Sequence, residues 1–582
     1  MKNKFNSKHN HKNANPNNSK MKGYDFMKKT NKFAAFALAA CMMAPMTMAT
    51  TASFTASAAT AGRVTITDEQ GTSYGHKYDV YKIFDGTMNS GKLEGITFAG
   101  ADFSTFLTDL KSDSTIGADF ASCTTVVDTA KVLGRYDNNS VKAKAFAKFV
   151  ATNKNLVKEV SKDNSNTISL ADDGYYVIIE QDTSGTPESV ALTSYLLTTY
   201  DASEGQDIKA KSAIPSLEKK IQENFKTGTW QNDDTYGERY NDTADFSIGD
   251  TVPFKLYGTM PSNIADYPSY KYVFHDKLGS EFTPIDDVKV YAVNGTDRKE
   301  ISSASYSKTV SKTASSGDTI TVSFEDLKSA VDAENNKITL NASTKIIVEY
   351  TAILNENAKI GKPGQTNAAY LEYSNNPNVG GSGETSKTPE DKVIAFTYEL
   401  DVTKLDGATK DKLEGAKFKL KAEEGAHSGK WANVSNGKIS GWVDDEADAT
   451  ELVSDVNGEF SVIGLDDGKY SLTETLAPSG YNKLTSAIEF IISAETSNSQ
   501  NDNTIDGDEL TKLEIKVGES GNPVDGDLVS GAVSMEVENN SGSTLPSTGG
   551  IGTTIFYVLG GTLVVGSGIA LVTKKRLGKN ED

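Results

Sequence analysis

The sequence predicts a mainly β protein made of tandem β-sandwich domains, with some helix in the first domain. Short runs of alternating apolar and polar residues recur along the chain and are separated by turns rich in Gly, Asn and Asp, a pattern typical of strands. Hydrophobic residues make up only 37% of the chain, which agrees with many strands that are solvated on one face. With 582 residues, the chain is long enough for three or four domains of about 150 residues each.

The charge and the motif content exclude several classes of function. The formal net charge is -20 at pH 7, whereas nucleic-acid binding needs a basic surface. The 5 His residues are scattered, and the sequence has no phosphate-binding loop and no catalytic-triad spacing. We therefore expect no metal ion, no cofactor, no nucleic-acid partner and no enzymatic activity.

The N-terminal residues have the pattern of an export signal. Three lysines precede the apolar run FAAFALAACMMAPMTMA, and small residues follow it. We predict that a signal peptide occupies residues 1–58 and that its cleavage leaves Ala59 first, to within a few residues. Because residues 1–26 make an unusually long basic region, translation from Met21 or Met27 is an alternative.

The C-terminus predicts a membrane anchor that places the preceding chain outside the cell. Residues 551–573 carry no charge and are long enough to span a bilayer as a helix. A basic tail follows from Lys574, and the positive-inside rule keeps such a tail in the cytoplasm. Since Cys41 lies in the signal, Cys123 is alone in the exported part and no intramolecular disulfide can form; its role stays open.

Between the two ends the chain divides into three predicted domains. Residues 59–211 have the pattern of an α+β or strand-dominated domain with helices near residues 101–110 and 142–160. Residues 212–400 and 401–544 have the pattern of strand domains, because short alternating segments follow one another closely. Both later blocks begin alike, with SLEKKI and ELDVTKL, which indicates related folds. The stretch NNPNVGGSGETSKTPEDK is predicted as a surface loop.

A short peptide, LPSTGG, stands directly before the uncharged segment. The peptide, the uncharged segment and the basic tail together make up residues 545–582. This region resembles the cell-wall sorting signal of Gram-positive surface proteins. The resemblance implies that a sortase, whose nucleophile is a Cys, cuts after the Thr and keeps it as a thioester. Pro bends the peptide, and Gly leaves the carbonyl open to attack, so the membrane segment is a temporary tether. The predicted cleavage site consists of Leu545, Pro546, Ser547, Thr548 and Gly549.

The third block contains YSLTETLAPSGY, which resembles the E-box of immunoglobulin-like pilin domains of the collagen-adhesin B-repeat type. In that family a Lys of the first strand is joined to an Asn of the last strand by a spontaneous isopeptide bond, helped by the E-box Glu. The resemblance implies Lys404, Glu474 and Asn539 for these roles, with Asn540 as the alternative to Asn539. Strand alternation points the Lys and the Asn inward. The chemistry needs this burial, because a desolvated Lys loses its proton and a buried Glu keeps one.

The second block has a looser version of the same set and resembles the middle domain of backbone pilins. IPSLEKKI places Lys219 inward, NAAYLEYSNNP places Asn367 inward, and YVFHDKL offers Asp276 as the carboxyl group. We expect an isopeptide bond between Lys219 and Asn367, with Lys220 and Asn375 as alternatives. In both blocks we expect the bond to join the first strand to the last.

The junction QDIKAKSAIPSLEKKI, between the first two blocks, offers an acceptor for polymerisation. Backbone pilins carry a Lys here, usually in a Tyr-Pro-Lys motif, and its ε-amine attacks the Thr thioester of the next subunit. The Tyr-Pro is missing from this chain, so the match rests on position. Lys211 aligns best and Lys209 is the alternative, whereas the plain interpretation of either is a solvated linker lysine.

From GRVTI to the basic tail, the sequence thus resembles the backbone subunit of a sortase-assembled pilus. The resemblance implies a structural protein anchored to peptidoglycan, with sortase, further copies of itself, minor pilins and host surface ligands as partners. One alternative is a singly anchored wall adhesin or a minor pilin, which would not use Lys211. Another is a wall-anchored hydrolase, for which the sequence offers no catalytic constellation.

Overall fold

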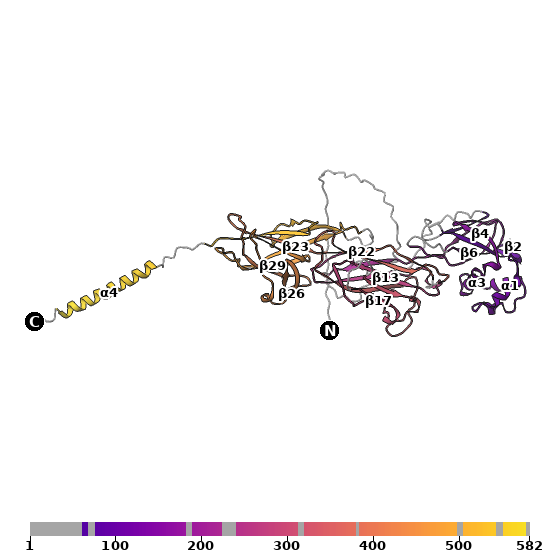
Figure 1. Cartoon of the computed structure of the whole chain (residues 1–582), viewed down its shortest axis with the longest axis horizontal. Coiled ribbons are helices and arrows are strands. Elements are labelled where there is room, and N and C mark those ends of the chain that lie inside the picture. The colour runs from indigo at the N-terminus through magenta and orange to yellow at the C-terminus, as the bar shows by residue number, and fades with distance from the viewer. Residues whose placement is uncertain are drawn as a thin grey trace, which may run out of the picture. The chain divides into compact units, whose positions relative to one another are not determined.

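The computed structural model describes residues 61–67, 76–181, 189–223, 240–311, 319–379, 383–497, 505–542 and 551–577 (Figure 1). Within these residues the chain is mostly β, and its strands form five sheets. The predicted fold class is therefore confirmed.

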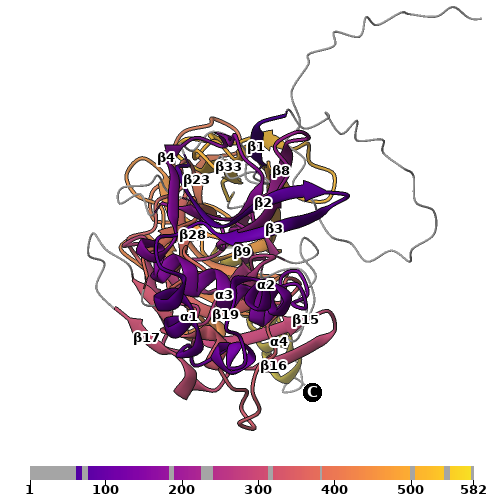
Figure 2. The ribbon, with the colours of Figure 1, turned by 90° about the vertical axis from the view of Figure 1, so that its right-hand side faces the viewer.

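The first part of the chain combines two small sheets with three helices. Its elements are β1 (Arg63–Thr67), β2 (Tyr78–Asn89), β3 (Lys92–Phe98), α1 (Phe103–Lys111), α2 (Val126–Leu133), α3 (Val141–Thr152), β4 (Lys158–Asn164), β5 (Thr167–Ser169), β6 (Gly174–Glu180), β7 (Leu196–Tyr200) and β8 (Gln206–Lys209). One sheet has the order β3-β2-β6-β7 with β4 beside β2, and the other has the order β5-β1-β8. Figure 2 shows α1, α2 and α3 gathered on one side of β2 and β3. Cys123 is a buried, free thiol in the core of this helical side.

The helices of this part differ in two ways from the prediction. The predicted helix 142–160 is wrong beyond Thr152, because the Asn153 side chain and backbone N–H both bond to Phe149 O and end the helix. The chain then continues as β4, whose residues pair with β2. The sequence analysis also missed α2, which begins with a reciprocal capping box between Thr125 and Asp128.

The middle part consists of two seven-stranded sheets that face each other. Its strands are β9 (Leu217–Gln222), β10 (Tyr240–Asn241), β11 (Thr243–Asp245), β12 (Thr251–Thr259), β13 (Tyr272–Leu278), β14 (Phe282–Pro284), β15 (Lys289–Asn294), β16 (Asp297–Glu300), β17 (Ser307–Val310), β18 (Ile320–Phe324), β19 (Lys345–Leu354), β20 (Gln365–Ser374), β21 (Thr385–Lys387) and β22 (Asp391–Phe396). One sheet has the order β10-β9-β12-β19-β15-β16, with β14 on β19. The other has the order β11-β22-β20-β13-β18-β17, with β21 on β20. Phe254 of the first sheet and Phe274 of the second share one hydrophobic core.

The last β-rich part forms an eleven-stranded sheet whose two halves pack on each other. Its strands are β23 (Tyr398–Asp406), β24 (Lys417–Ala422), β25 (Trp431–Ser435), β26 (Lys438–Val443), β27 (Leu452–Val453), β28 (Glu459–Leu465), β29 (Gly468–Leu476), β30 (Ile488–Thr496), β31 (Leu510–Val517), β32 (Val524–Asp525) and β33 (Ala532–Asn539). The order is β32-β31-β30-β29-β24-β25-β26-β28-β23-β33, with β27 on β24. Phe418 of β24 and Phe460 of β28 stack across the core with ring centroids 5.4 Å apart. β23 and β33, the first and last strands, run parallel side by side.

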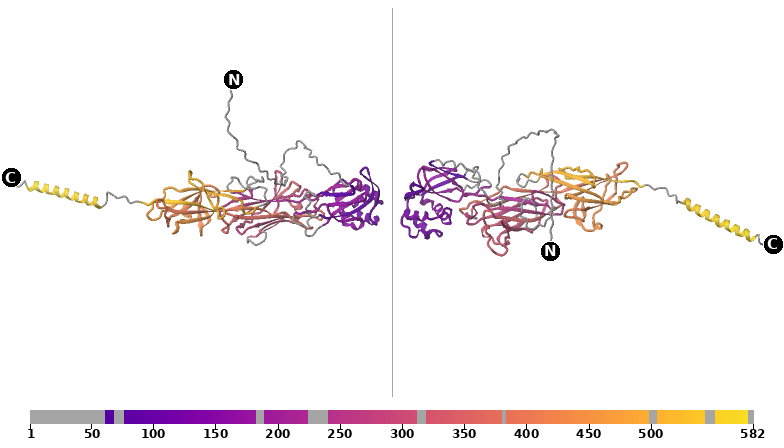
Figure 3. Two further views of the ribbon diagram at one scale, coloured as in Figure 1. Left: turned by 90° about the horizontal axis from the view of Figure 1, so that it is seen from above. Right: turned by 180° about the vertical axis from the view of Figure 1, so that it is seen from behind.

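In the described part of the chain, α-helices occur only in the first part and near the C-terminus, as α4 (Ile551–Leu577) (Figure 3). The predicted signal peptide and the sorting peptide 545–549 lie outside the described residues. The predicted span 551–573 also includes terminal residues whose side chains are not described. Where side chains are described, we find no helix that is both long and apolar enough to cross a membrane. The membrane span therefore stays a prediction.

The predicted loop 375–392 contains short strands. β21 lies inside it and pairs with β20, and β22 begins at its end. The described part of this stretch is therefore an extension of the sheet as well as a connection.

Candidate functional sites

The predicted reactive residues of the middle part meet between its two sheets. Lys219 lies on β9, whereas Asp276 on β13 and Asn367 on β20 belong to the opposite sheet. All three side chains are fully buried, and Lys219 Nζ pairs with Asp276 Oδ2. Asn367 stands opposite Leu278, two residues from Asp276, so the carboxyl and the amide project from the same face of that sheet.

A tyrosine that the sequence analysis did not single out lies at the centre of this set. The Tyr350 hydroxyl donates to Asp276 Oδ2 at 2.8 Å. It accepts from Lys219 Nζ at 2.9 Å and from Asn367 Nδ2 at 2.7 Å, which uses its one donor and both acceptor positions. Alternation along β19 predicts an inward Tyr350, but an inward aromatic residue is usually only core packing.

The surroundings of the middle site favour a neutral amine. Burial lowers the pKa of Lys219, and the Asp276 carboxylate opposes this effect. Burial raises the pKa of Tyr350 well above its ordinary value, so the hydroxyl keeps its proton. An uncharged Lys219 beside an amide is the arrangement that nucleophilic attack on that amide requires.

The two alternatives for this site do not reach it. Lys220 Nζ pairs with Asp242, and Asn375 Nδ2 donates to Ser386 Oγ at 3.0 Å. The expected first-to-last link needs a correction here, because Asn367 lies on β20 and both β21 and β22 follow it before β23.

The predicted residues of the C-terminal part also come together, at the end of the β23–β33 pair. Lys404 stands opposite Val537 in the parallel register, and its Nζ donates to Val537 O at 3.0 Å. Asn539 Nδ2 donates to Glu474 Oε2 at 3.1 Å and to Asn482 O at 2.5 Å. Lys404, Glu474 and Asn539 are all buried.

The surroundings of Lys404 also favour the neutral amine that amide formation requires. Burial lowers the pKa of Lys404 to about 8, although Glu474 and Glu538 act in the opposite direction. Among the described residues, Glu474 Oε1 and Asn539 Oδ1 have no hydrogen-bond partner, so the carboxyl and the amide carbonyl are available to each other. The alternative Asn540 is exposed, which favours Asn539.

The candidate acceptor Lys211 lies between β8 and β9 and is held by both neighbouring parts. Its backbone N–H donates to Thr193 Oγ1 at 2.7 Å, and its carbonyl accepts from Asn263 Nδ2 at 2.6 Å. Its Nζ donates to Asn139 Oδ1 in the turn before α3. The sequence analysis could not foresee these partners, because they come from distant segments.

Burial is the main influence on the pKa of Lys211, and it favours the unprotonated amine. Partial burial lowers the pKa of Lys211; Asp266 raises it and Lys144 lowers it. Asp266 is itself occupied, since it pairs with Lys144 Nζ and accepts from Ser194 Oγ at 3.1 Å. Lys209, the alternative acceptor, is exposed at the end of β8 opposite Thr67.

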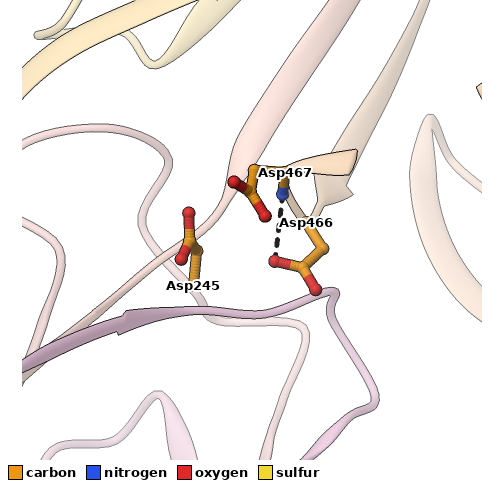
Figure 4. Close-up of side chains that lie close together, drawn as sticks. All are labelled: Asp245, Asp466 and Asp467. Atoms are coloured by element: carbon orange, nitrogen blue, oxygen red, sulfur yellow. Dashed lines mark hydrogen bonds between the residues drawn. The ribbon is translucent and has the colours of Figure 1, made fainter. Parts of the chain in front are cut away.

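Three aspartates form a cluster that the sequence analysis did not anticipate (Figure 4). Asp245 ends β11, and Asp466 and Asp467 occupy the turn between β28 and β29; one oxygen of each lies within 4.8 Å of the others. Carboxylate oxygens are ligands for hard cations. Burial, reinforced by Glu223 and Asp467, raises the pKa of Asp245 well above its ordinary value. Protonation of Asp245 would relieve the repulsion between these carboxylates.

We expect Asp245→Asn to raise the unfolding temperature at pH 7, with a difference from wild type that shrinks toward pH 5. The pKa of Asp245 is higher in the folded than in the unfolded chain. The stability that Asp245 contributes is therefore fully present below its pKa in the unfolded chain, about 3.9. It is lost as the pH rises through the pKa of Asp245 in the folded chain. Thermal unfolding at both pH values measures this, with the exposed Asp444→Asn as control. A variant less stable than wild type at pH 7 would show that the carboxylate itself is needed.

Comparison with known proteins gives matches in the same regions. Residues 398–505 match the family described as prealbumin-like fold domain, and residues 537–576 match the LPXTG cell wall anchor motif. The chain is 25% identical over 430 residues to the trypsin-resistant surface T6 protein of Streptococcus pyogenes serotype M6, covering 64% of this chain and 71% of that protein.

Similar solved structures include two pilins. The T6 backbone pilin of serotype M6 Streptococcus pyogenes is 18% identical, with a TM-score of 0.46, over 83% of this chain and 98% of that chain. The full-length major pilin SpaD from Corynebacterium diphtheriae is 15% identical, with a TM-score of 0.41, over 83% of this chain and 98% of that chain.

The matched segments contain the motifs on which the sequence analysis depends. The prealbumin-like match includes Lys404 and Glu474, and the anchor match includes Asn539 and the LPSTG peptide. The anchor motif assigns the chain to the cell wall. The chain therefore carries a prealbumin-like fold domain followed by a cell-wall anchor motif, and it is similar to a streptococcal surface protein.

Proposed function

We propose that a sortase joins copies of this chain head to tail through Thr548 and Lys211. The bond between Thr548 and Gly549 breaks as the sortase thiol forms a thioester with Thr548. The neutral Lys211 amine of the next subunit then attacks this thioester, an amide forms, one proton leaves the nitrogen, and the sortase thiol is released. A link of this kind does not close on itself and gives an open fibre. The last subunit passes to peptidoglycan.

The setting of Lys211 is the observation that carries this proposal. Its backbone is fixed by Thr193 and Asn263, its amine bonds to the neutral Asn139 side chain, and Asp266 is paired with Lys144. An amine with a lowered pKa, held at one place on the surface, suits attack on a thioester.

Co-expression with its sortase tests this function. We expect a ladder of multimers that survives boiling in detergent, and a branched tryptic peptide in which the Thr548 carboxyl is linked to Lys211. A single band of wall-linked monomer would contradict polymerisation and favour the adhesin or minor pilin. A ladder with a different branch point would contradict only the choice of Lys211.

We further propose that isopeptide bonds join Lys219 to Asn367 and Lys404 to Asn539. Each bond forms when the neutral lysine nitrogen attacks the Asn Cγ, and the amide nitrogen leaves as ammonia with the proton that the lysine nitrogen loses. Asp276 and Glu474 are the proposed acids. Burial of both sets and the lowered pKa values of the two lysines support these bonds.

The intact mass of the secreted region 59–548 should therefore lie about 34 Da below the sequence value, because each bond expels one ammonia of about 17 Da. A mass deficit that corresponds to one bond only would contradict the bond between Lys219 and Asn367, because its sequence match is the less complete of the two. An unshifted mass would contradict both bonds. Tryptic mapping of the branched peptides assigns each deficit to its pair.

We also propose three domains, 59–211, 212–400 and 401–544, with one adjustment. β23 begins at Tyr398 and is continuous to Asp406, so the last domain starts at 398. In the described residues each sheet is made of strands from only one of the three regions, which supports this division.

A further inference from the structure

We propose that Tyr350 is a catalytic residue of the middle site, which passes a proton to the leaving amide nitrogen while the bond between Lys219 and Asn367 forms. The inference rests on the internal bond proposed above. Nothing in the sequence pattern or in the matched families assigns a role to this residue.

The first support is the position of the hydroxyl between the acid and the amide. Asn367 Nδ2 donates to the Tyr350 oxygen, and among the described residues Asn367 Oδ1 has no hydrogen-bond partner. The Tyr350 hydroxyl in turn donates to Asp276 Oδ2. Asp276 is therefore connected to the amide through Tyr350.

The second support is the contrast with the C-terminal site of the same chain. There Asn539 Nδ2 donates directly to Glu474 Oε2 at 3.1 Å. The longer Glu side chain brings its carboxyl to the amide, whereas the shorter Asp276 meets a hydroxyl first. The two sites share the proposed reaction, and the middle site has a hydroxyl between its acid and its amide where the C-terminal site has a direct hydrogen bond.

The proposed step conserves every proton. At the start the amine of Lys219 is neutral, and the proton that it gave up lies on Asp276. The protonated Asp276 carboxyl donates to the Tyr350 oxygen, and the Tyr350 hydroxyl hydrogen then turns toward Asn367. The Lys219 nitrogen attacks Cγ, and the bond between Cγ and Nδ2 breaks. Tyr350 gives its proton to Nδ2, recovers one from Asp276, and Asp276 takes one from the Lys219 nitrogen. Ammonia leaves, and both catalytic groups return to their starting states.

Tyr350 has the properties that this role requires. It is buried, and its ring stacks on Phe254 with centroids 5.2 Å apart, so its hydroxyl is held in place. Burial raises its pKa well above the ordinary value, so the group is a proton donor and not a phenolate. Phe at this position would keep the ring and the stacking and remove only the hydroxyl.

The test is the intact mass of the Tyr350→Phe variant of the secreted region, compared with its own sequence value. We expect a deficit of about 17 Da, from the C-terminal bond alone, where the wild type shows about 34 Da. Tyr272→Phe is the matched control, because Tyr272 is also buried in the middle part and its hydroxyl donates to Thr259 O at 2.8 Å. The control should retain both bonds.

Folding is checked separately by circular dichroism and protease resistance. If Tyr350→Phe does not fold, the wild-type sequence is made by cell-free synthesis with 3-fluorotyrosine in place of tyrosine, and both bonds are followed by mass over time. Fluorine changes the acidity of the phenol and preserves its shape. We expect the rate of the middle bond to change severalfold and the rate of the C-terminal bond to stay the same.

The outcomes separate the relay from the bonds themselves. A folded Tyr350→Phe chain that forms the middle bond as fast and as fully as wild type would overturn the relay and leave the isopeptide proposal intact. Equal rates with tyrosine and fluorotyrosine would overturn it as well. A wild-type chain without the middle bond would contradict the proposed bond and the relay together.

Discussion

The Glu474→Ala variant is expected to leave Lys404 and Asn539 unjoined and to unfold at a clearly lower temperature than the wild type. The bond would close a loop of roughly 135 residues, and by analogy with disulfide loop entropy it contributes about 4–5 kcal/mol to the free energy of unfolding. For a domain of this size that corresponds to about 10–20 °C. Calorimetry of the C-terminal transition measures the shift, and the mass deficit reports the missing bond.

The control variants separate the bond from other effects of the substitution. Glu474 Oε2 also accepts from Leu484 N at 2.7 Å, so Ala removes a second hydrogen bond. Lys404→Met keeps this contact and removes the nucleophile together with its hydrogen bond to Val537 O, and it should show the same loss of bond and a similar fall in temperature. Glu538→Gln changes an exposed carboxylate on β33, the strand of Asn539, and should retain the bond. An unchanged transition in unlinked Lys404→Met would show that the loop-entropy analogy does not hold here.

The inward position of the C-terminal set could be predicted from sequence because burial alternates along most of β23 and along β33. Leu400, Val402 and Lys404 are buried on β23, and Val537 and Asn539 are buried on β33. A period of two residues allows only one inward set on each strand. The choice of these residues and of the E-box acid came from the resemblance to a known family, and strand alternation added that the Lys and the Asn point inward.

The middle set was predictable only in part. On β9 alternation is incomplete, because Lys219 and Lys220 are both buried. They pair with different carboxylates, Asp276 on β13 and Asp242 between β10 and β11. The central Tyr350 is about 130 residues from Lys219. Its role depends on how two sheets face each other, which no strand pattern contains.

The setting of Lys211 and the aspartate cluster could not be predicted for the same reason. Lys211 interacts with Asn139, which precedes it by many residues in the sequence, and with Asp266, which follows it by many residues. Asp245 and Asp466, which lie close together, belong to two different predicted domains. Hydrophobic periodicity specifies the faces of single elements. Contacts between elements of different domains leave no periodic signal.

Replacing Lys211 by Ala is expected to abolish the high-mass ladder while the monomer still becomes attached to the wall. Thr548 remains the donor, and peptidoglycan remains an acceptor, so only the link between subunits is lost. Immunoblots of wall extracts from cells with the cognate sortase measure both species. Lys209→Ala is the matched control, since it removes the neighbouring lysine of the same junction and should leave the ladder unchanged. A ladder that persists in both variants would place the acceptor elsewhere.

The same link determines which residues carry tension in the fibre. Force entering at Lys211 reaches β9 within a few residues and leaves through Thr548. The proposed bonds bypass the chain between Lys219 and Asn367 and between Lys404 and Asn539, so those strands cannot be extended. The chain between Asn367 and Lys404, which contains β21 and β22, has no such bypass and depends on hydrogen bonds to β20 and β11. The Lys211 link places the first part outside this path. Most of the extension of wild-type fibres under load should therefore come from this segment. Extension of fibres that also includes the first part would contradict Lys211 as the point of attachment.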